Sequence, residues 1–401
     1  MTQPHDLKRE VQAHVYKSGD LAATLTRTPE GVAFSYTDEW VAAGGAPVAS
    51  TLPVVGSELV RPSGAVPAFF EGLLPEGRRL SALRRSVKTS ADDELSLLIA
   101  VGPDTVGDVM VVPANSAPLE MSGPVELAEP SSMRFADLLA DAGIHPQRGS
   151  LPGVQDKVSG VMLSLPVAVS GGRCILKLNP PEFAHLVENE DFFLRAARTA
   201  GLRVVDAQIV HDSTGEPGLL INRFDRVSVD DHIRTLAVED GCQVLNRAPA
   251  DKYNLTTEEV FGALADLCDA RTLAVRELFA QLVFAYVSGN GDAHAKNFSV
   301  MRLDSGEWRV CPAYDLPSSR FYGDVAMALM VGPRAKTDLG AQDFLALASE
   351  LRLPERAARA VLREQAERVS SWSEGLDELP FDVGLTRKVK RFIANRAARI
   401  I

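Results

Sequence analysis

The most informative stretch for chemistry is residues 289–297, GNGDAHAKN, a polar loop that follows a long apolar run. Asp292 and Asn297 stand five residues apart, and Asp315 follows Asn297 by eighteen. In kinase catalytic loops an aspartate accepts the hydroxyl proton, an asparagine five residues later holds Mg²⁺, and a second carboxylate follows a short hairpin. Each residue alone is explained as well by a helix cap or a turn. The ordered set favours a phosphoryl-transfer site.

Such a site also needs a cation, and Lys177 is the candidate, inside the apolar run 174–178, CILKL. A lysine in the middle of a strand is costly if it is buried without a partner. Nucleotide phosphates and a carboxylate at the start of the next helix would supply that partner, and Glu190 is preferred there over Glu188. The alternative is a lysine on an edge strand that faces solvent.

The loop 148–157 is a weak phosphate cradle, because its only glycines are Gly149 and Gly153. It matches neither G-x-x-x-x-G-K-[ST] nor G-x-G-x-x-G. Ser150 stands beside Arg148 in a loop that would face a nucleotide, which makes this serine a candidate phosphoacceptor. An ordinary turn serine is the simpler interpretation on spacing alone.

Two further features belong to the same hypothesis. The stretch 219–226, LLINRFDR, is an apolar strand that ends in charge. In a kinase, this is the place where the hinge between the lobes would present backbone groups to adenine. A surface strand end with a salt bridge remains a credible alternative. The seven histidines are scattered along the chain, so we expect His294 to form a hydrogen bond near phosphate rather than to bind zinc.

The elements that must position these residues fall into three parts. Short runs at 11–16, 21–25 and 32–36, separated by turns, predict an antiparallel meander, and helical patterns follow at 66–87 and 92–100. A strand at 109–112 precedes a connector rich in Pro, Ser, Ala and Glu. We therefore expect a β-rich N-terminal part at 1–115 and a connector at 116–130.

The rest of the chain is expected to form a mixed region at 131–245 and a helical lobe at 246–401. The mixed region has strand patterns at 158–165, 173–178, 204–210 and 219–224, with helices at 133–142 and 186–200. In the lobe, Thr256 and Glu259 form a capping box for a helix to residue 268. An apolar helix at 273–287, a hairpin of strands 298–303 and 308–311, and helices near 341–350, 354–371 and 384–400 follow.

Composition places few restrictions on this hypothesis. The 401 residues are 46% apolar and carry a formal net charge of −11, which argues against an autonomous nucleic-acid binder. The four cysteines form no C-x-x-C pair, which fits a reducing compartment. No secretory signal and no apolar stretch of membrane-spanning length are visible, so we expect a cytoplasmic protein without membrane contact.

Taken in order, these pieces resemble the HipA-type serine/threonine-protein kinases, the toxin components of bacterial type II toxin–antitoxin systems. The resemblance covers nearly the whole chain. Single pieces are weak, whereas their order and joint presence are specific. They are the segments 69–77, 101–104 with Gly107, 150–157, 223–226, 239–243, 292–299 and 314–315.

The resemblance implies an α+β, protein-kinase-like fold with a β-rich N-terminal subdomain and a kinase core whose C-terminal lobe is all-α. It implies ATP and Mg²⁺ as cofactors, Asp292 as the catalytic base, and Asn297 and Asp315 as metal ligands. Ser150 falls on the family's autophosphorylation position, and we expect its phosphorylation to switch the kinase off. The implied ATP-binding residues are Ser150, Gly153, Lys157, Lys177, Asn222, Phe224, Asp225, His294 and Tyr314, with Glu190 as the ion-pair partner of Lys177.

The family also implies partners: a small HipB-like DNA-binding antitoxin, and a protein substrate in translation such as an aminoacyl-tRNA synthetase. Contact with DNA would then be indirect, through the antitoxin. Two alternatives stay open. One is a small-molecule kinase resembling aminoglycoside phosphotransferases, which share the Asp-to-Asn spacing. The other is a catalytically silent co-repressor that only binds an antitoxin.

Overall fold

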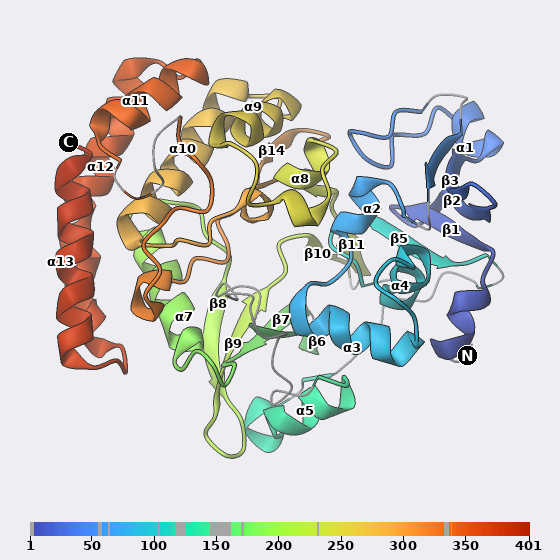
Figure 1. The fold of residues 1–401 in the computed structure, drawn as a ribbon, viewed down its shortest axis with the longest axis horizontal. Coiled ribbons are helices and arrows are strands. Elements are labelled where there is room, and N and C mark those ends of the chain that lie inside the picture. The colour runs from blue at the N-terminus through green and yellow to red at the C-terminus, as the bar shows by residue number, and fades with distance from the viewer. Residues whose placement is uncertain are drawn as a thin grey trace.

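The computed structural model describes residues 4–54, 58–62, 65–102, 104–114, 116, 126–127, 129–144, 162–169, 172–230, 232–332, 337 and 339–401. Figure 1 shows three parts: a small β-rich unit on the right, a central sheet with the helices α5 (Phe135–Asp141) and α7 (Leu186–Thr199) below the middle, and a helical lobe on the left. The expected α+β class is confirmed. Most of the predicted connector and the whole loop 148–157 lie outside the described residues.

The β-rich unit, here called the N-terminal domain, is a five-stranded antiparallel sheet in the order β4-β3-β2-β1-β5. The predicted meander and the later strand are confirmed. The strands are β1 (Gln12–Lys17), β2 (Asp20–Thr28), β3 (Gly31–Tyr36), β4 (Leu59–Pro62) and β5 (Val109–Pro113). The short helix α1 (Asp38–Ala42) follows β3, and α4 (Glu94–Val101) precedes β5.

The single helix expected at 66–87 is wrong in one respect, because it is two helices, α2 (Ala68–Gly72) and α3 (Gly77–Val87). Pro75 disfavours helical backbone at the residue before it, and Glu76 is extended with φ −108° and ψ 171°. Gly77 then has a φ of +56°, in the left-handed region that glycine tolerates. The break exposes the segment 73–76 to the centre of the molecule, where it becomes part of the site.

The central sheet has the order β6-β7-β9-β8, with all neighbours antiparallel. Its strands are β6 (Leu163–Val169), β7 (Gly172–Leu178), β8 (Ala207–His211) and β9 (Pro217–Asn222), and α5 (Phe135–Asp141) and α7 (Leu186–Thr199) accompany them. Of the predicted strand at 158–165, residues 158–161 lie outside the described residues, and β6 begins at Leu163. The hairpin of β10 (Arg226–Val229) and β11 (His232–Thr235) was not predicted, since its strands are short and polar.

The helical lobe contains the predicted helices, at nearly the predicted bounds. They are α9 (Thr257–Leu267), α10 (Arg271–Ser288), α11 (Ala341–Glu350), α12 (Glu355–Ser373) and α13 (Val383–Arg399), and the unpredicted α8 (Gly241–Val244) precedes them. The Thr256 capping box is confirmed, with the Thr256 side chain accepting from the Glu259 N–H. A three-stranded sheet joins β12 (Val238–Asp240) to the expected hairpin of β13 (Ser299–Arg302) and β14 (Trp308–Val310).

Burial explains why the site loop is rigid at its base. Helix α10 is apolar on most of its circumference, and twelve of its residues from Ala274 to Ser288 are buried. It belongs to the largest apolar core, which also contains Val389, Ile393 and Ile400 of the docked C-terminal helix. All four cysteines are buried free thiols. Across the described residues, no helix is long and apolar enough to span a membrane.

Candidate active site

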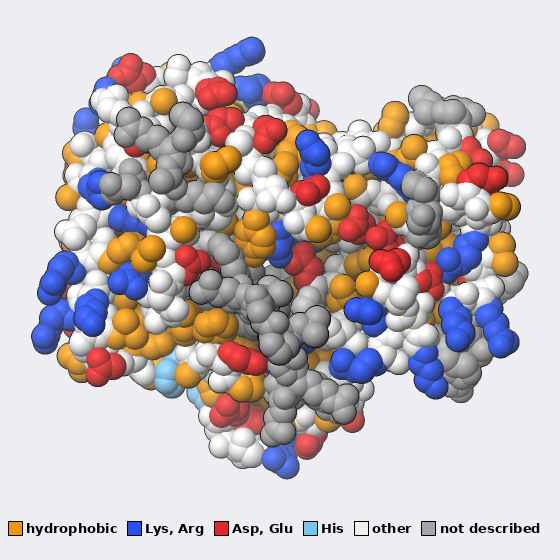
Figure 2. Space-filling model, in the orientation of Figure 1, with side chains coloured by type: hydrophobic (Ala, Val, Ile, Leu, Met, Phe, Trp, Pro, Cys, Tyr) orange, Lys and Arg blue, Asp and Glu red, His pale blue; other side chains and the backbone are white. Residues whose placement is uncertain are grey.

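A cavity of about 300 Å³ lies where the N-terminal domain, the central sheet and the helical lobe meet. Figure 2 shows the surface indented between the N-terminal domain on the right and the rest of the molecule, with acidic and basic side chains at the walls. The N-terminal domain supplies 72–76 and 104–106, the central sheet supplies Lys177 and 221–225, and the helical lobe supplies Lys296, Tyr314 and Asp315. Residues far apart in the sequence thus share one cavity.

The loop after α10 is built to hold Asp292 in place. Gly289 ends the helix with a φ of +77°, and its missing side chain leaves room for Phe392 and Arg320. The side chain of Asn290 then accepts a hydrogen bond from the Asp292 N–H at 3.0 Å. Asp292 is 3% exposed, and one carboxylate oxygen accepts a hydrogen bond from the Tyr253 hydroxyl at 2.8 Å.

The two predicted metal ligands lie side by side. Asn297 Nδ2 is 2.6 Å from Asp315 Oδ2, and the Asn297 side-chain oxygen accepts from the His294 N–H at 3.0 Å. The β13–β14 hairpin brings Asp315 back to the loop, and Asn290 Nδ2 bonds the Asp315 carbonyl at 3.2 Å. Asp315 has a φ of +57°, a left-handed conformation that costs free energy in a residue other than glycine and is concentrated at functional sites.

Lys177 links Asp315 to Glu190, the helix carboxylate preferred from the sequence. Its ammonium is 2.7 and 3.0 Å from the two Glu190 oxygens and 2.9 Å from Asp315 Oδ1. Although burial opposes its charge, the two carboxylates raise the pKa of Lys177. Burial raises the pKa of Glu190 to about 7, whereas Lys177 keeps that of Asp315 below its ordinary value against the effect of burial.

The donor set fits Mg²⁺. One buried ammonium faces two carboxylates, so the cluster has an excess of negative charge that a divalent cation would balance. Among the described residues, no three His, Cys, Asp or Glu side chains group as a metal site. Mg²⁺ does not need three, because it uses one or two carboxylates together with phosphate oxygens and water. Asn297 and Asp315 would be the residues that hold it.

His294 lies next to this cluster but outside the residues that line the cavity. Its ring packs edge-on against Tyr253, with 5.1 Å between the ring centres. Neither ring nitrogen has a hydrogen-bond partner among the described residues, although the side chain is 4% exposed. Burial, and then the nearby Lys252, lower the pKa of His294 to about 4, so the ring is neutral at pH 7. A neutral ring is able to donate from one nitrogen and accept at the other.

The predicted adenine-binding residues form one wall of the cavity. Phe224 and Tyr314 lie with ring centres 5.8 Å apart, and both line the cavity with Asn222. The Asn222 N–H donates to the Asp206 carbonyl at 2.8 Å, so a backbone contact from Asn222 to a base must use its carbonyl. The Asn222 side chain accepts from the Cys174 thiol at 3.2 Å and is therefore also engaged within the sheet.

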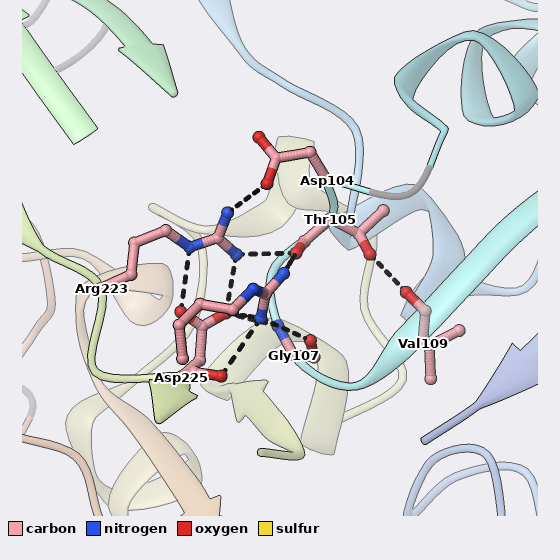
Figure 3. A network of polar contacts seen from close by, with 7 residues as sticks. Asp104, Thr105, Gly107, Val109, Arg223 and Asp225 are labelled. Carbon is pink, nitrogen blue, oxygen red and sulfur yellow. Dashed lines mark hydrogen bonds and ion pairs between the residues drawn. The ribbon is translucent and has the colours of Figure 1, made fainter. Parts of the chain in front are cut away.

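Asp225 lines the same wall, but the structure places its carboxylate in a cross-link between domains. Arg223 donates to both of its oxygens at 3.0 and 2.7 Å, Arg226 donates at 2.7 Å, and the Gly107 N–H donates at 2.9 Å. Figure 3 shows this network, in which Arg223 also reaches Asp104 and the Thr105 carbonyl. The main contacts of the Asp225 carboxylate therefore join the loop 104–107 to the segment 223–226, and they are not directed into the cavity.

Several residues of the site were not found from the sequence. Glu76 of the N-terminal domain pairs with Lys296 at 2.9 Å and also with Lys252. Against the effect of burial, these lysines lower the pKa of Glu76 to about 2. Tyr253, which bonds Asp292, was also missed, and no local signal marks it. Of the predicted residues, Ser150, Gly153 and Lys157 lie outside the described part of the chain.

The arrangement defines a class of fold before any comparison is made. A smaller mixed lobe and a helical lobe meet at a cavity lined by Lys177 and Asp315, and Asn297 bonds Asp315 from the loop that also carries Asp292, which is the layout of protein-kinase-like proteins. The HipA-like C-terminal domain matches residues 149–373, and the HipA N-terminal domain matches residues 13–112. The chain therefore belongs to the HipA family.

Individual relatives agree with this assignment. The protein Y4mE of Sinorhizobium fredii is 29% identical over 96% of this chain and 97% of its own length. The serine/threonine-protein kinase toxin HipA of Shewanella oneidensis is 28% identical over 75% of this chain and 73% of its own. The fold is similar to that of HipA from S. oneidensis in a complex with HipB and operator DNA, with a TM-score of 0.79, 24% identity, and coverage of 96% and 97% of the two chains.

Proposed function

We propose that this chain is an ATP-dependent serine/threonine protein kinase of the HipA toxin type. The observation that carries the proposal is the shared set of short contacts from Lys177 to Glu190 and Asp315 and from Asp315 to Asn297, beside the buried Asp292. Buried charges in such a cluster are costly unless they serve a ligand or one another. Perturbed groups that gather in a cavity are candidates for catalysis.

The residues divide the work of phosphoryl transfer among them. The Asp292 carboxylate accepts the proton of the attacking hydroxyl and orients that hydroxyl toward the transferred group. Lys177 stabilises phosphate charge and is itself oriented by Glu190. Asn297 and Asp315 would hold Mg²⁺, which supplies further charge neutralisation when it is bound. The wall of Asn222, Phe224 and Tyr314 would receive the adenine.

Regulation and partners are proposed from the family. Ser150 would accept phosphate from the chain's own ATP, and the added charge of roughly −1.5 to −2 would expel its loop from the phosphate site. A relative is named as a kinase toxin, and a similar fold is known in complex with HipB and operator DNA. By analogy, a HipB-like antitoxin would bind this chain in the cytoplasm, and a translation component such as an aminoacyl-tRNA synthetase would be its substrate.

The test is intact mass and phosphopeptide mapping after incubation of the full chain with Mg-ATP. Three proteins are compared: the native chain, Asp292→Asn and Ser150→Ala. We expect phosphate on Ser150 of the native chain, none on Asp292→Asn, and none at this position in Ser150→Ala. A native chain that binds ATP but transfers no phosphate to itself or to lysate proteins would refute the kinase. Transfer to lysate proteins without modification of Ser150 would refute self-inactivation alone.

A further inference from the structure

Tyr253 makes a direct contact with the carboxylate that the proposed reaction needs most. Its hydroxyl donates to Asp292 Oδ1 at 2.8 Å, across 39 positions of sequence. The ring is fixed separately, because it packs edge-on against His294 at 5.1 Å with 77° between the planes. The phenol therefore reaches the carboxylate from a ring whose direction is already set.

The segment that carries Tyr253 is attached to the catalytic loop and to the N-terminal domain. The Lys252 carbonyl accepts a hydrogen bond from the Ala295 N–H at 3.2 Å, which ties the backbone beside Tyr253 to the loop that contains Asp292. The Lys252 side chain pairs with Glu76, and its ammonium lies 5.3 Å from the centre of the Tyr253 ring. These contacts fix the position of the segment that carries Tyr253.

A fixed donor on one oxygen has a defined chemical consequence. A carboxylate has about four acceptor positions on two oxygens, and the bond from Tyr253 occupies one of them. It also limits rotation of the carboxylate, and catalytic groups must be held within about 0.5 Å and 10–20° of the productive geometry. Small misplacements of about 1 Å are able to cost 100-fold in rate.

We propose that Tyr253 is a positioning residue for phosphoryl transfer, which fixes the Asp292 carboxylate by its hydroxyl. This role rests on the proposed kinase function. It differs from that of a residue that binds nucleotide, because the Tyr253 hydroxyl donates to the proposed base Asp292 and not to a residue of the proposed adenine wall. Removal of the hydroxyl therefore affects the turnover rate and leaves the affinity for ATP unchanged.

The same geometry also defines the opposite role for Tyr253, in which its hydroxyl inhibits the reaction. A tyrosine hydroxyl against the proton acceptor is placed as a substrate hydroxyl would be placed, and it would then compete with the substrate. In that case removal of the hydroxyl raises turnover. The positioning role and the competing role are thus distinguished by the sign of one measurement.

The experiment compares the native full chain with Tyr253→Phe, Tyr253→Ala and a control, Tyr16→Phe, on strand β1 of the N-terminal domain. ADP formation from Mg-ATP is measured with the chain's own serines and threonines as acceptors, before self-phosphorylation is complete. Its first-order rate constant at saturating ATP is taken as kcat, and ATP affinity is measured by calorimetry. For Tyr253→Phe we expect kcat to fall about 10- to 100-fold, the worth of a hydrogen bond to a charged group, with KM and Kd for ATP unchanged. Tyr253→Ala falls further, because the packing on His294 is also lost, and Tyr16→Phe equals the native chain.

Two results would overturn the positioning role and leave the kinase function intact. The first is an unchanged or raised kcat in Tyr253→Phe. The second is a lowered kcat together with an equal loss of ATP affinity, or with a loss of thermal stability larger than that of Tyr16→Phe. A native chain that forms no ADP would overturn the kinase and the positioning role together. The native rate thus separates failure of the function from failure of the inference.

Discussion

Replacing Asp225 by asparagine separates two roles that its carboxylate is able to have, a structural cross-link and a nucleotide contact. In the structure, Asp225 is 3% exposed and balances the buried guanidinium groups of Arg223 and Arg226. Breaking a buried ion pair by removing one partner costs roughly 3–5 kcal/mol. At about 2–4 °C per kcal/mol for a unit of 150–250 residues, Tm should fall by roughly 6–20 °C.

The assay is thermal unfolding of the Asp225→Asn chain together with its ATP affinity. The control is Glu355→Gln, which removes an exposed pair with Arg359 on one helix and should cost less than about 1 kcal/mol. We expect a large fall in Tm with little change in the Kd for ATP. A Tm equal to that of the control, with ATP binding weakened tenfold or more, would refute the structural assignment of Asp225.

The same variant has a defined pH dependence. Against the effect of burial, the two arginines hold the pKa of Asp225 below its ordinary value of 3.8. A lowered carboxyl pKa contributes stability that is present above pH 3.8 and is lost as the pH falls through the folded-state pKa. The difference in stability between the native and Asp225→Asn chains should therefore be constant from pH 8 to about pH 5 and shrink only in stronger acid.

Two further predictions concern the site and its support. Lys177→Met leaves Glu190 and Asp315 without their cation, so we expect loss of ADP formation and a loss of stability of roughly 3–5 kcal/mol at pH 8. Burial raises the pKa of Glu190 to about 7 in the native chain, and loss of Lys177 raises it further, so the part of the deficit due to Glu190 arises only above about pH 7 and unfolding at pH 4.5 should show a smaller deficit. An equal deficit at both pH values would contradict this. Gly241→Ala would place a Cβ 2.8 Å from the Ala295 carbonyl, so it should displace the catalytic loop and lower both Tm and kcat. Gly262→Ala meets nothing within 4 Å in helix α9 and should instead stabilise by roughly 0.5–1 kcal/mol; similar Tm values for the two variants would contradict the packing argument.

The sequence predicted the elements whose signals are local. The alternation in β1 to β3, the Thr256 capping box and the long apolar pattern of α10 each depend on neighbouring residues, and each is present. The helical pattern at 66–87 misled because its apolar spacing continues through Pro75 and Gly77, where local backbone preferences break the helix. The ion pairs of Glu76 with Lys252 and Lys296, which lie far along the chain, could not be predicted from that spacing.

For the site, spacing along the chain was informative where the geometry is local. Asp292 and Asn297 lie on one loop, and a hairpin returns Asp315 beside them, so their order in the sequence already defined the cluster. Lys177 and Glu190 are separated by only thirteen residues, a strand and the first turns of a helix. The sequence was less informative about Asp225, which was assigned to the nucleotide pocket. Its contact with Gly107 could not be predicted, because this partner is 118 residues away along the chain.

By itself, then, the sequence determined that this chain has an ordered set of candidate phosphoryl-transfer residues on an α+β framework, because those residues are fixed by short loops and by hydrophobic periodicity. Only the tertiary structure decided which other side chains contact these residues and fix their positions. Tyr253 against Asp292, Glu76 between two lysines, and the Gly107 N–H against Asp225 are pairs that form when distant parts of the chain pack together. No local pattern encodes these pairs, because their free energy depends on burial and charge that exist only after the chain has folded.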